Sequence, residues 1–246
     1  SFKEIPYDIK IMIVDRCMER SAGPFFLIPE LKQFMESLKV PFPQEQDYDK
    51  EFKEETTGLY NSNTVFQFYH QSSNVPHPGR GVGEKIDARE IHNFTKLATI
   101  SEWRRKLSNL WIEPITMDGH TWNSVEHFYQ ASKFRENNPQ FYLTFAVDVN
   151  PSGALAKDPV LAKYAGSKSG KYKGKLVRPL DVKLDATFFG GRDKATKKRA
   201  LMAKFSKKEF KELLIATRNS KLQQFVRASP PIVLIELMEV RKALLK

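Results

Sequence analysis

Runs of alternating apolar and polar residues predict a few short strands in this chain. Residues 9–14 are mostly apolar, and residues 64–69 alternate phenylalanine with polar side chains, so both ranges favour extended structure. In residues 112–122 the pair Asp118-Gly119 interrupts the apolar pattern, and this dipeptide is a strong signal for a hairpin turn. We therefore expect a few short antiparallel strands.

Helical spacing of apolar residues covers much of the remainder. The expected helices are residues 29–38, 123–134, 139–146, 152–164, 193–205, 206–217 and 231–245. Ser206 and Glu209 fit a capping box at the start of one helix, and Pro231 suits the first turn of the last. The pattern predicts an α+β fold that is predominantly helical, with a few short antiparallel strands.

A change in composition near residue 60 indicates a domain boundary. Residues 41–58 are polar, acid-rich and without periodicity, as in a linker or a surface excursion. We expect residues 1–60 to form an N-terminal extension, packed on or linked to a core, and residues 61–246 to form the catalytic domain.

Composition limits the class of protein. The chain has 246 residues, of which 41% are hydrophobic and 12% aromatic, enough for a sizeable core. The single cysteine, Cys17, excludes an intramolecular disulfide and a multi-cysteine metal site. No stretch approaches the roughly 18 apolar residues of a membrane helix, and the chain does not open on a secretory signal. We expect an intracellular protein, in the cytoplasm or nucleus, with no membrane partner.

Basic charge is concentrated in one segment. The net charge is +11, and residues 157–211 hold 17 Lys and Arg against 5 Asp and Glu, whereas the rest of the chain is nearly balanced. Such a segment attracts phosphates, on nucleic acid or on a small molecule. The alternative is an ordinary solvated helix face.

Three polar side chains in the expected helix 123–134 form the main candidate site. Glu126, Gln130 and Lys133 stand at i, i+4 and i+7, so they share one stripe of the helix. Each has a simpler interpretation. Glu126 could complete a capping box with Asn123, Lys133 could be an extended surface lysine, and His127 could be a satisfied, partly buried histidine. No other histidine has metal-ligand spacing to His127, so we expect no metal site.

Two further candidates are weaker. The loop at residues 72–84 contains Gly79, Gly81 and Gly83 before Glu84, and alternating glycines let backbone N–H groups approach an anion. Farther along, Asp185 and Arg192 flank paired phenylalanines and are candidates for holding a sugar and a phosphate. A plain flexible loop and a core loop are the respective alternatives.

Together these segments resemble the YbiA-like NADAR family of N-glycosidases. The matching parts come in family order over about residues 64–245: Phe68-Tyr69, Leu107-Ser108-Asn109-Leu110-Trp111, Asp118-Gly119-His120-Thr121-Trp122, Ser124-Val125-Glu126-His127-Phe128-Tyr129-Gln130-Ala131-Ser132-Lys133-Phe134, and residues 199–205 with 213–217. The pattern Glu-His-aromatic-aromatic-Gln-Ala-x-Lys-Phe is highly specific. Residues 1–60 are not covered.

The resemblance implies hydrolysis of an N-glycosidic bond, either in riboflavin-pathway intermediates or in ADP-ribosylated guanine of nucleic acid. The family's essential glutamate maps onto Glu126 and its helix lysine onto Lys133. It implies no metal and no redox cofactor. One departure concerns residues 225–230, which lack the Trp-Gly-Asp and glycine-rich elements of the bacterial pattern. We hypothesise that the earlier glycine loop, with Asp185, supplies the missing pocket wall.

Specific roles follow from this reading. Phe68, Tyr69 or Trp122 would stack on the leaving base. Asn109, His127 and Gln130 would hold ribose hydroxyls, with Ser108 beside them, and the glycine loop would hold a pyrophosphate. The leading expectation is an ADP-ribosyl hydrolase acting on guanine in DNA or RNA. The alternatives are a glycosidase of phosphorylated riboflavin intermediates and a non-catalytic module that binds ADP-ribose or nucleic acid.

Overall fold

The computed structural model describes residues 33–34, 37 and 56–246 of the chain. The contacts divide the chain into two units, Ser1–Thr57 and Gly58–Lys246. The strand expected at residues 9–14 lies outside the described residues, as does most of the helix expected at residues 29–38. Gln33, Phe34 and Ser37 from that range are helical. The role of residues 1–60 as an extension stays a prediction.

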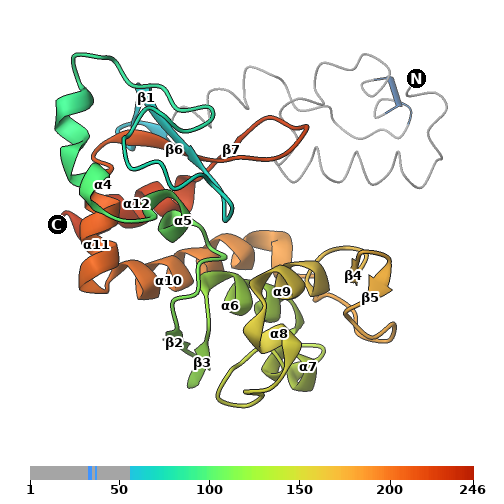
Figure 1. The fold of residues 1–246 in the computed structure, drawn as a ribbon. Helices are drawn as coiled ribbons and strands as arrows, with labels where there is room; N and C mark the ends of the chain where they lie inside the picture. The colour runs from blue at the N-terminus through green and yellow to red at the C-terminus, as the bar shows by residue number, and fades with distance from the viewer. Residues whose placement is uncertain (1–32, 35–36, 38–55) are drawn as a thin grey trace. The chain divides into compact units, whose positions relative to one another are not determined.

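Unit Gly58–Lys246 is an α+β fold of short helices and short strands (Figure 1). Its elements, in chain order, are β1 (Asn61–Phe68), η3 (Ile91–Phe94), α4 (Thr95–Thr99), α5 (Trp103–Leu107), β2 (Ile115–Met117), β3 (His120–Trp122), α6 (Val125–Ala131), η4 (Ser132–Phe134), α7 (Pro139–Leu143), α8 (Ala154–Lys157), α9 (Pro159–Ala165), β4 (Lys171–Tyr172), β5 (Lys175–Leu176), η5 (Phe188–Arg192), α10 (Asp193–Phe205), α11 (Lys208–Ala216), β6 (Ser220–Gln224), β7 (Ile232–Val233) and α12 (Ile235–Leu244).

Most of the expected elements of this unit are confirmed. The strand at residues 64–69 is β1, and the Asp118-Gly119 turn joins β2 to β3 as an antiparallel hairpin. Asp118 and Gly119 both have positive φ, the conformation for which this dipeptide is suited. The helix expected at residues 123–134 is α6 continued by the 3-10 turn η4, and α10 spans residues 193–205 as expected.

Three helix boundaries differ from expectation, each for a local reason. The helix expected at residues 152–164 is two helices, because Asp158 accepts hydrogen bonds from the backbone of Val160 and Leu161 and starts α9 afresh at Pro159. The expected capping box at Ser206 is absent, and Glu209 pairs with Lys106 instead. The last helix begins at Ile235 rather than near residue 231, because β7 precedes it.

The expectation that the strands are antiparallel is wrong for β1. This strand pairs in parallel with β6, matching Phe66 to Leu222 and Phe68 to Gln224, and β7 then pairs antiparallel to β6. A parallel partner needs a long crossover, which the local hydrophobic pattern does not reveal. The hairpins β2–β3 and β4–β5 are antiparallel.

The core joins the sheet to two groups of helices. Helix α10 packs against both α6 and α12, and in Figure 1 it runs between the sheet with α4, α5 and α12 on one side and α6 to α9 on the other. Phe66 of β1 lies edge-on to Phe94 and Trp103, with ring centroids 5.2 Å and 5.3 Å away. None of the described helices is both long and apolar enough to cross a bilayer.

Candidate active site

Helix α6 begins at a cap that does not use Glu126. Ser124 has extended backbone angles, and its hydroxyl accepts a hydrogen bond from the backbone N–H of His127. Asn123, the expected cap, instead donates its side-chain amide to the carbonyl of Ala156 at 2.8 Å. The backbone N–H of Glu126 donates to the carbonyl of Asn109 at 3.0 Å. The capping-box interpretation of Glu126 is therefore wrong, and its carboxylate is left for other contacts.

Glu126, Gln130 and Lys133 lie together on one buried side of this helix. Gln130 Nε2 donates to Glu126 Oε1 at 2.8 Å, and Lys133 Nζ donates to the carbonyl of Gly166 at 3.0 Å. The three residues are 6%, 6% and 7% exposed, so the surface-lysine interpretation of Lys133 is wrong as well. Among the described residues, no hydrogen bond reaches Glu126 Oε2, and none reaches the buried Gln130 Oε1. Acceptors of this kind suit the hydroxyls of a sugar.

Gly166, the residue that ends α9, is needed for this arrangement. A Cβ atom at this position would stand 2.0 Å from Gln130 Oε1, much closer than real contacts allow. The close backbone approach brings the Gly166 carbonyl to Lys133. Because glycine has no side chain, the end of α9 can pack closely against Gln130 and Lys133.

Burial changes the acid–base behaviour of Lys133. It lowers the pKa of the amine to about 8, against the opposing effect of the Glu126 charge and with smaller contributions from Lys197 and Arg178. The amine lies 5.1 Å from the ring centre of Tyr129 and 5.4 Å from that of Phe189. At pH 7 roughly a tenth of such amines is neutral, compared with far less than 1% of ordinary lysines. Lys133 is thus closer to a usable nucleophile than a solvated lysine.

Asp185 supports Lys133 rather than facing a ligand. Its two carboxylate oxygens accept hydrogen bonds from the backbone N–H groups of Glu136 and Asn137, both at 3.0 Å, and its own N–H donates to the Lys133 carbonyl at 2.7 Å. Asp185 is 1% exposed. Arg192 forms an ion pair with Glu136 at 2.7 Å. Both carboxylate oxygens of Asp185 hold the turn after η4, which does not favour the sugar-binding role expected for it, and that role stays a prediction.

The glycine loop is filled by its own carboxylate. Glu84 Oε2 accepts hydrogen bonds from the backbone of Gly79 at 2.8 Å and Gly81 at 3.0 Å, and Glu84 also forms a 2.6 Å ion pair with Arg104. A Cβ at Gly83 would fall 2.2 Å from Gln67. The loop is therefore a packed structural element. The expected pyrophosphate role is not supported, because an internal anion already occupies the N–H groups of Gly79 and Gly81.

Other expected base-binding aromatics belong to the core. Phe68 is 2% exposed and Trp122 is fully buried, with its indole N–H donated to the carbonyl of Met117. Their burial does not favour the stacking on a base that was expected of them, and that role stays a prediction. Tyr69 is partly exposed and lies 5.1 Å from Phe225, ring centre to ring centre. Ser108 is buried, and its hydroxyl accepts from the backbone N–H of Leu110.

His127 is fully buried beside the stripe. Its Nδ1 lies 2.8 Å from the Ser124 hydroxyl, and Nε2 has no hydrogen-bond partner among the described residues. Burial lowers its pKa to about 4, so the ring is neutral at pH 7. The contact with Ser124 orients the ring as part of the α6 cap. Across the described part of the chain, no group of three His, Cys, Asp or Glu side chains is arranged to hold a metal ion.

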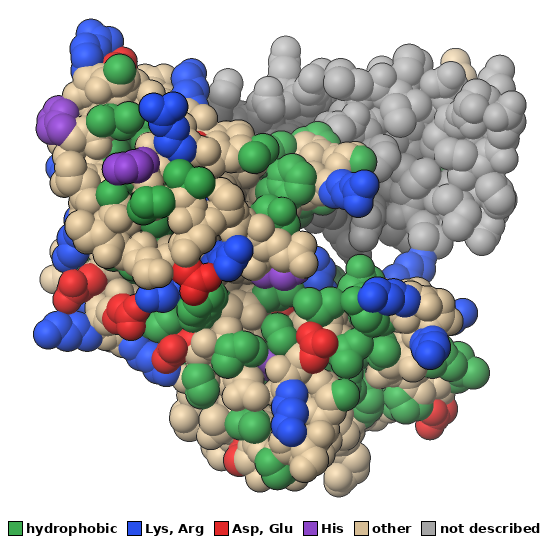
Figure 2. Space-filling model, viewed as in Figure 1, with side chains coloured by type: hydrophobic (Ala, Val, Ile, Leu, Met, Phe, Trp, Pro, Cys, Tyr) green, Lys and Arg blue, Asp and Glu red, His purple; other side chains and the backbone are tan. Residues whose placement is uncertain are grey.

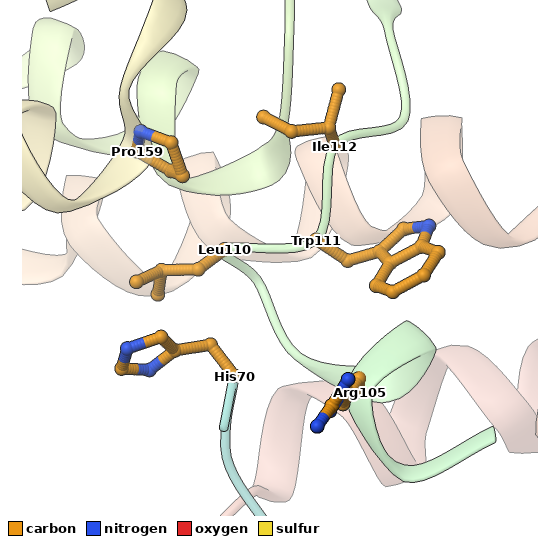
Figure 3. A pocket seen from close by; sticks show the side chains of 6 residues that line it. All are labelled: His70, Arg105, Leu110, Trp111, Ile112 and Pro159. Carbon is orange, nitrogen blue, oxygen red and sulfur yellow. The ribbon is translucent and has the colours of Figure 1, made fainter. Parts of the chain in front are cut away.

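A hollow of about 360 Å³ lies near the start of α6 (Figure 3). Its lining is His70, Arg105, Leu110, Trp111, Ile112 and Pro159. The catalytic candidates Glu126 and Lys133 do not line it. The two features are joined through Asn109, which bonds to the Glu126 backbone and directly precedes Leu110. The local sequence pattern does not mark these lining residues as functional, although Leu110 and Trp111 belong to a segment that carries the family resemblance.

Comparisons with known proteins give one likeness in fold. No family model and no curated protein sequence matches this chain. Among solved structures, the chain is similar to the NMR structure of the E. coli protein YbiA. The TM-score is 0.44 and the sequence identity 20%, over 75% of this chain and 87% of YbiA.

Several basic side chains of the basic segment are paired with acids within the protein. Lys197 pairs with Glu236, Lys198 with Glu239, Arg199 with Asp118, and Lys207 with Glu113. The hairpin β4–β5 carries three exposed lysines, Lys171, Lys173 and Lys175, that form no ion pair with another described residue. Figure 2 shows basic side chains gathered over this hairpin. Exposed lysines that form no ion pair with a described residue also lie outside the hairpin, at Lys157, Lys163, Lys208 and Lys211, so the positive charge of the segment is only partly concentrated there.

Lys204 of α10 is a fully buried lysine that fixes the segment leading to the site. Its amine donates to the backbone carbonyls of Lys106 at 2.6 Å and Ser108 at 2.8 Å. Burial lowers its pKa to about 7. These two hydrogen bonds fix the end of α5 and Ser108. Ser108 directly precedes Asn109, whose carbonyl accepts the hydrogen bond from the Glu126 backbone.

We expect this buried amine to make stability depend on pH. The unfolded chain has an ordinary lysine pKa of 10.5 and binds more protons than the folded chain above about pH 7, so the free energy of unfolding should rise from about pH 7 to about pH 9. Lys133 adds to the same slope. Urea unfolding at several pH values measures it. The Lys204→Met variant, although less stable throughout, should show a smaller slope, whereas an unchanged slope would contradict the assignment.

Proposed function

We propose that this chain is an N-glycosidase, which hydrolyses the bond between a ribose anomeric carbon and a base nitrogen. The observation that carries this proposal is the buried side of α6, where Glu126 and Lys133 are neither used in capping nor exposed on the surface. A buried carboxylate beside an amine of lowered pKa suits bond cleavage at a sugar carbon that develops positive charge. The sequence resemblance of residues 126–134 to the NADAR family supports the same chemistry.

Two routes are open to these groups. In the direct route, Glu126 stabilises the positive charge at the anomeric carbon and deprotonates the attacking water. In the covalent route, the neutral Lys133 amine bonds to the anomeric carbon while the base leaves with the bonding electron pair and takes a proton. The ring oxygen then departs to form an imine, which water hydrolyses to regenerate the amine. Glu126 would carry the protons in this route.

The more specific proposal is removal of ADP-ribose from guanine in nucleic acid. It is supported by the exposed lysines of β4–β5, which could contact a phosphate backbone. The second candidate is a glycosidase of phosphorylated riboflavin-pathway intermediates, favoured by the small size of the hollow near α6. Incubating the protein with ADP-ribosylated guanine oligonucleotides and, separately, with the riboflavin intermediates decides between them. Release of neither product would contradict both.

The hairpin lysines give a separate prediction about nucleic-acid binding. Replacing Lys171, Lys173 and Lys175 together by glutamine should reduce the salt dependence of oligonucleotide affinity, the slope of log K against log salt, by up to about 3. The matched control replaces Lys96, Lys198 and Lys207, each of which already pairs with an acid. Fluorescence anisotropy at several salt concentrations measures both. An equal loss of slope in both triple variants would contradict a specific role for the hairpin.

A further inference from the structure

The hollow near α6 is large enough to hold a small ligand. It brings together four separate segments: the residue after Tyr69, helix α5, the loop at residues 110–112, and the start of α9. Its size of about 360 Å³ is near the lower end of the roughly 300–1,000 Å³ of small-molecule sites. Such a space suits a one- or two-ring ligand rather than a whole dinucleotide.

Trp111 differs from the other two tryptophans of the chain. Trp103 is 1% exposed and Trp122 fully buried, and both donate their indole N–H groups to backbone carbonyls. Trp111 is partly exposed at the hollow, and its N–H has no partner among the described residues. A partly exposed indole with a free donor is a common feature of sites for flat ligands.

His70 provides a polar edge on the same hollow. No hydrogen bond to its ring is formed by any described residue, and its nearest ring contact is Tyr69 at 5.7 Å. Burial, with the positive charge of Lys163, lowers the pKa of His70, so at pH 7 the ring is mainly neutral and offers one donor and one acceptor. Arg105 is committed to Ser72 and Glu102, so it adds a planar surface rather than a free charge.

We propose that this hollow binds a planar nitrogen heterocycle, packed against Trp111, Ile112 and Pro159 with its polar edge at His70. This role rests on the proposed function: the heterocycle is then the base that leaves when the N-glycosidic bond is cleaved. The base then sits beside Asn109, whose carbonyl holds the first turn of α6 through Glu126. This assignment replaces the buried Phe68 and Trp122 as the base-binding surface.

Tryptophan fluorescence tests the inference, because Trp111 is partly exposed whereas Trp103 and Trp122 are buried. Titration with guanosine 5′-monophosphate should quench the emission, and ribose 5-phosphate, which lacks the base, should not. In the Trp111→Phe variant the quenching should disappear while calorimetry still detects binding. Trp111→Ala should weaken binding about fivefold or more, the lower end of the effect of a lost stacking partner.

A matched pair of isoleucines controls for general effects of truncation. Ile112 lines the hollow and is 47% exposed, whereas Ile91 on η3 is 48% exposed and lies outside it. Ile112→Ala should weaken nucleotide binding and Ile91→Ala should not. Equal effects in both variants, no quenching at millimolar nucleotide, or equal binding of ribose 5-phosphate would overturn the inference.

The Glu126→Gln variant separates this inference from the proposed function. It should bind guanosine 5′-monophosphate as the unmodified chain does, because Glu126 does not line the hollow. Trp111-dependent binding without hydrolysis of any glycoside would contradict the proposed function but support the heterocycle site. Hydrolysis without Trp111-dependent binding would remove the heterocycle site alone.

Discussion

Replacing Glu126 by glutamine is expected to lower kcat by about 10²–10⁴-fold, the usual contribution of a positioned acid–base group. Glutamine keeps the size of the side chain and an oxygen that can accept the 2.8 Å hydrogen bond from Gln130. It removes the negative charge that would stabilise the developing cation and the base that would activate water. Steady-state hydrolysis of the substrate identified by product release measures the change, and circular dichroism checks that the fold is retained.

The matched control for this prediction is Glu209→Gln. Glu209 lies at the surface with 63% of its side chain exposed and pairs with Lys106, so its replacement should leave kcat unchanged. A Glu126→Gln protein that is folded and fully active would contradict the assignment of Glu126.

Lys133 distinguishes the two chemical routes. If the amine is the nucleophile, borohydride during turnover should trap the sugar on Lys133, Lys133→Met should abolish the adduct, and kcat should rise as pH passes about 8, where the amine loses its proton. Absence of an adduct during rapid turnover would favour direct attack by water, with Lys133 acting as a cation instead.

Replacing Glu84 by glutamine is expected to lower the free energy of unfolding by about 3–5 kcal/mol. Glu84 is fully buried and the side chain of Arg104 is 2% exposed, so the change leaves a guanidinium charge in the interior without its counter-charge. The same carboxylate also holds the N–H groups of Gly79 and Gly81. These contacts favour a stabilising role for Glu84 over the pocket wall that the sequence suggested for this loop.

Urea unfolding measures this effect, and a double variant tests its cause. Glu84→Gln combined with Arg104→Met should lose less stability than the two single variants added together, because the second change removes the uncompensated charge. The control is Asp87→Asn, which breaks the exposed Asp87–Arg89 pair and should produce no measurable change. Strict additivity of the two single changes would argue against a coupled pair.

The local parts of the fold could be predicted because their signals are local. The stripe formed by Glu126, Gln130 and Lys133 follows from helical spacing alone, and the β2–β3 turn follows from Asp118-Gly119. The parallel pairing of β1 with β6 could not be predicted, because it joins segments far apart in the chain. A hydrophobic period identifies a strand but not its neighbour.

The candidate site shows the same division. The sequence singled out Gly79, Gly81 and Asp185 by residue type, but their hydrogen-bond partners depend on tertiary contacts. A glycine loop that binds an external anion and one filled by its own glutamate have the same local sequence pattern. The hollow at Trp111 was missed for a related reason, since its walls come from four segments and no one segment marks it.

The pairing of β1 with β6 also constrains the order of folding during synthesis. β1 leaves the ribosome long before β6, and Arg241 of α12 donates to the Leu59 carbonyl across 182 residues of sequence. The edge of β1 that pairs with β6 therefore stays unpaired until residues 220–224 have been translated. Early translational arrest would leave that edge open to pairing with strands of other chains.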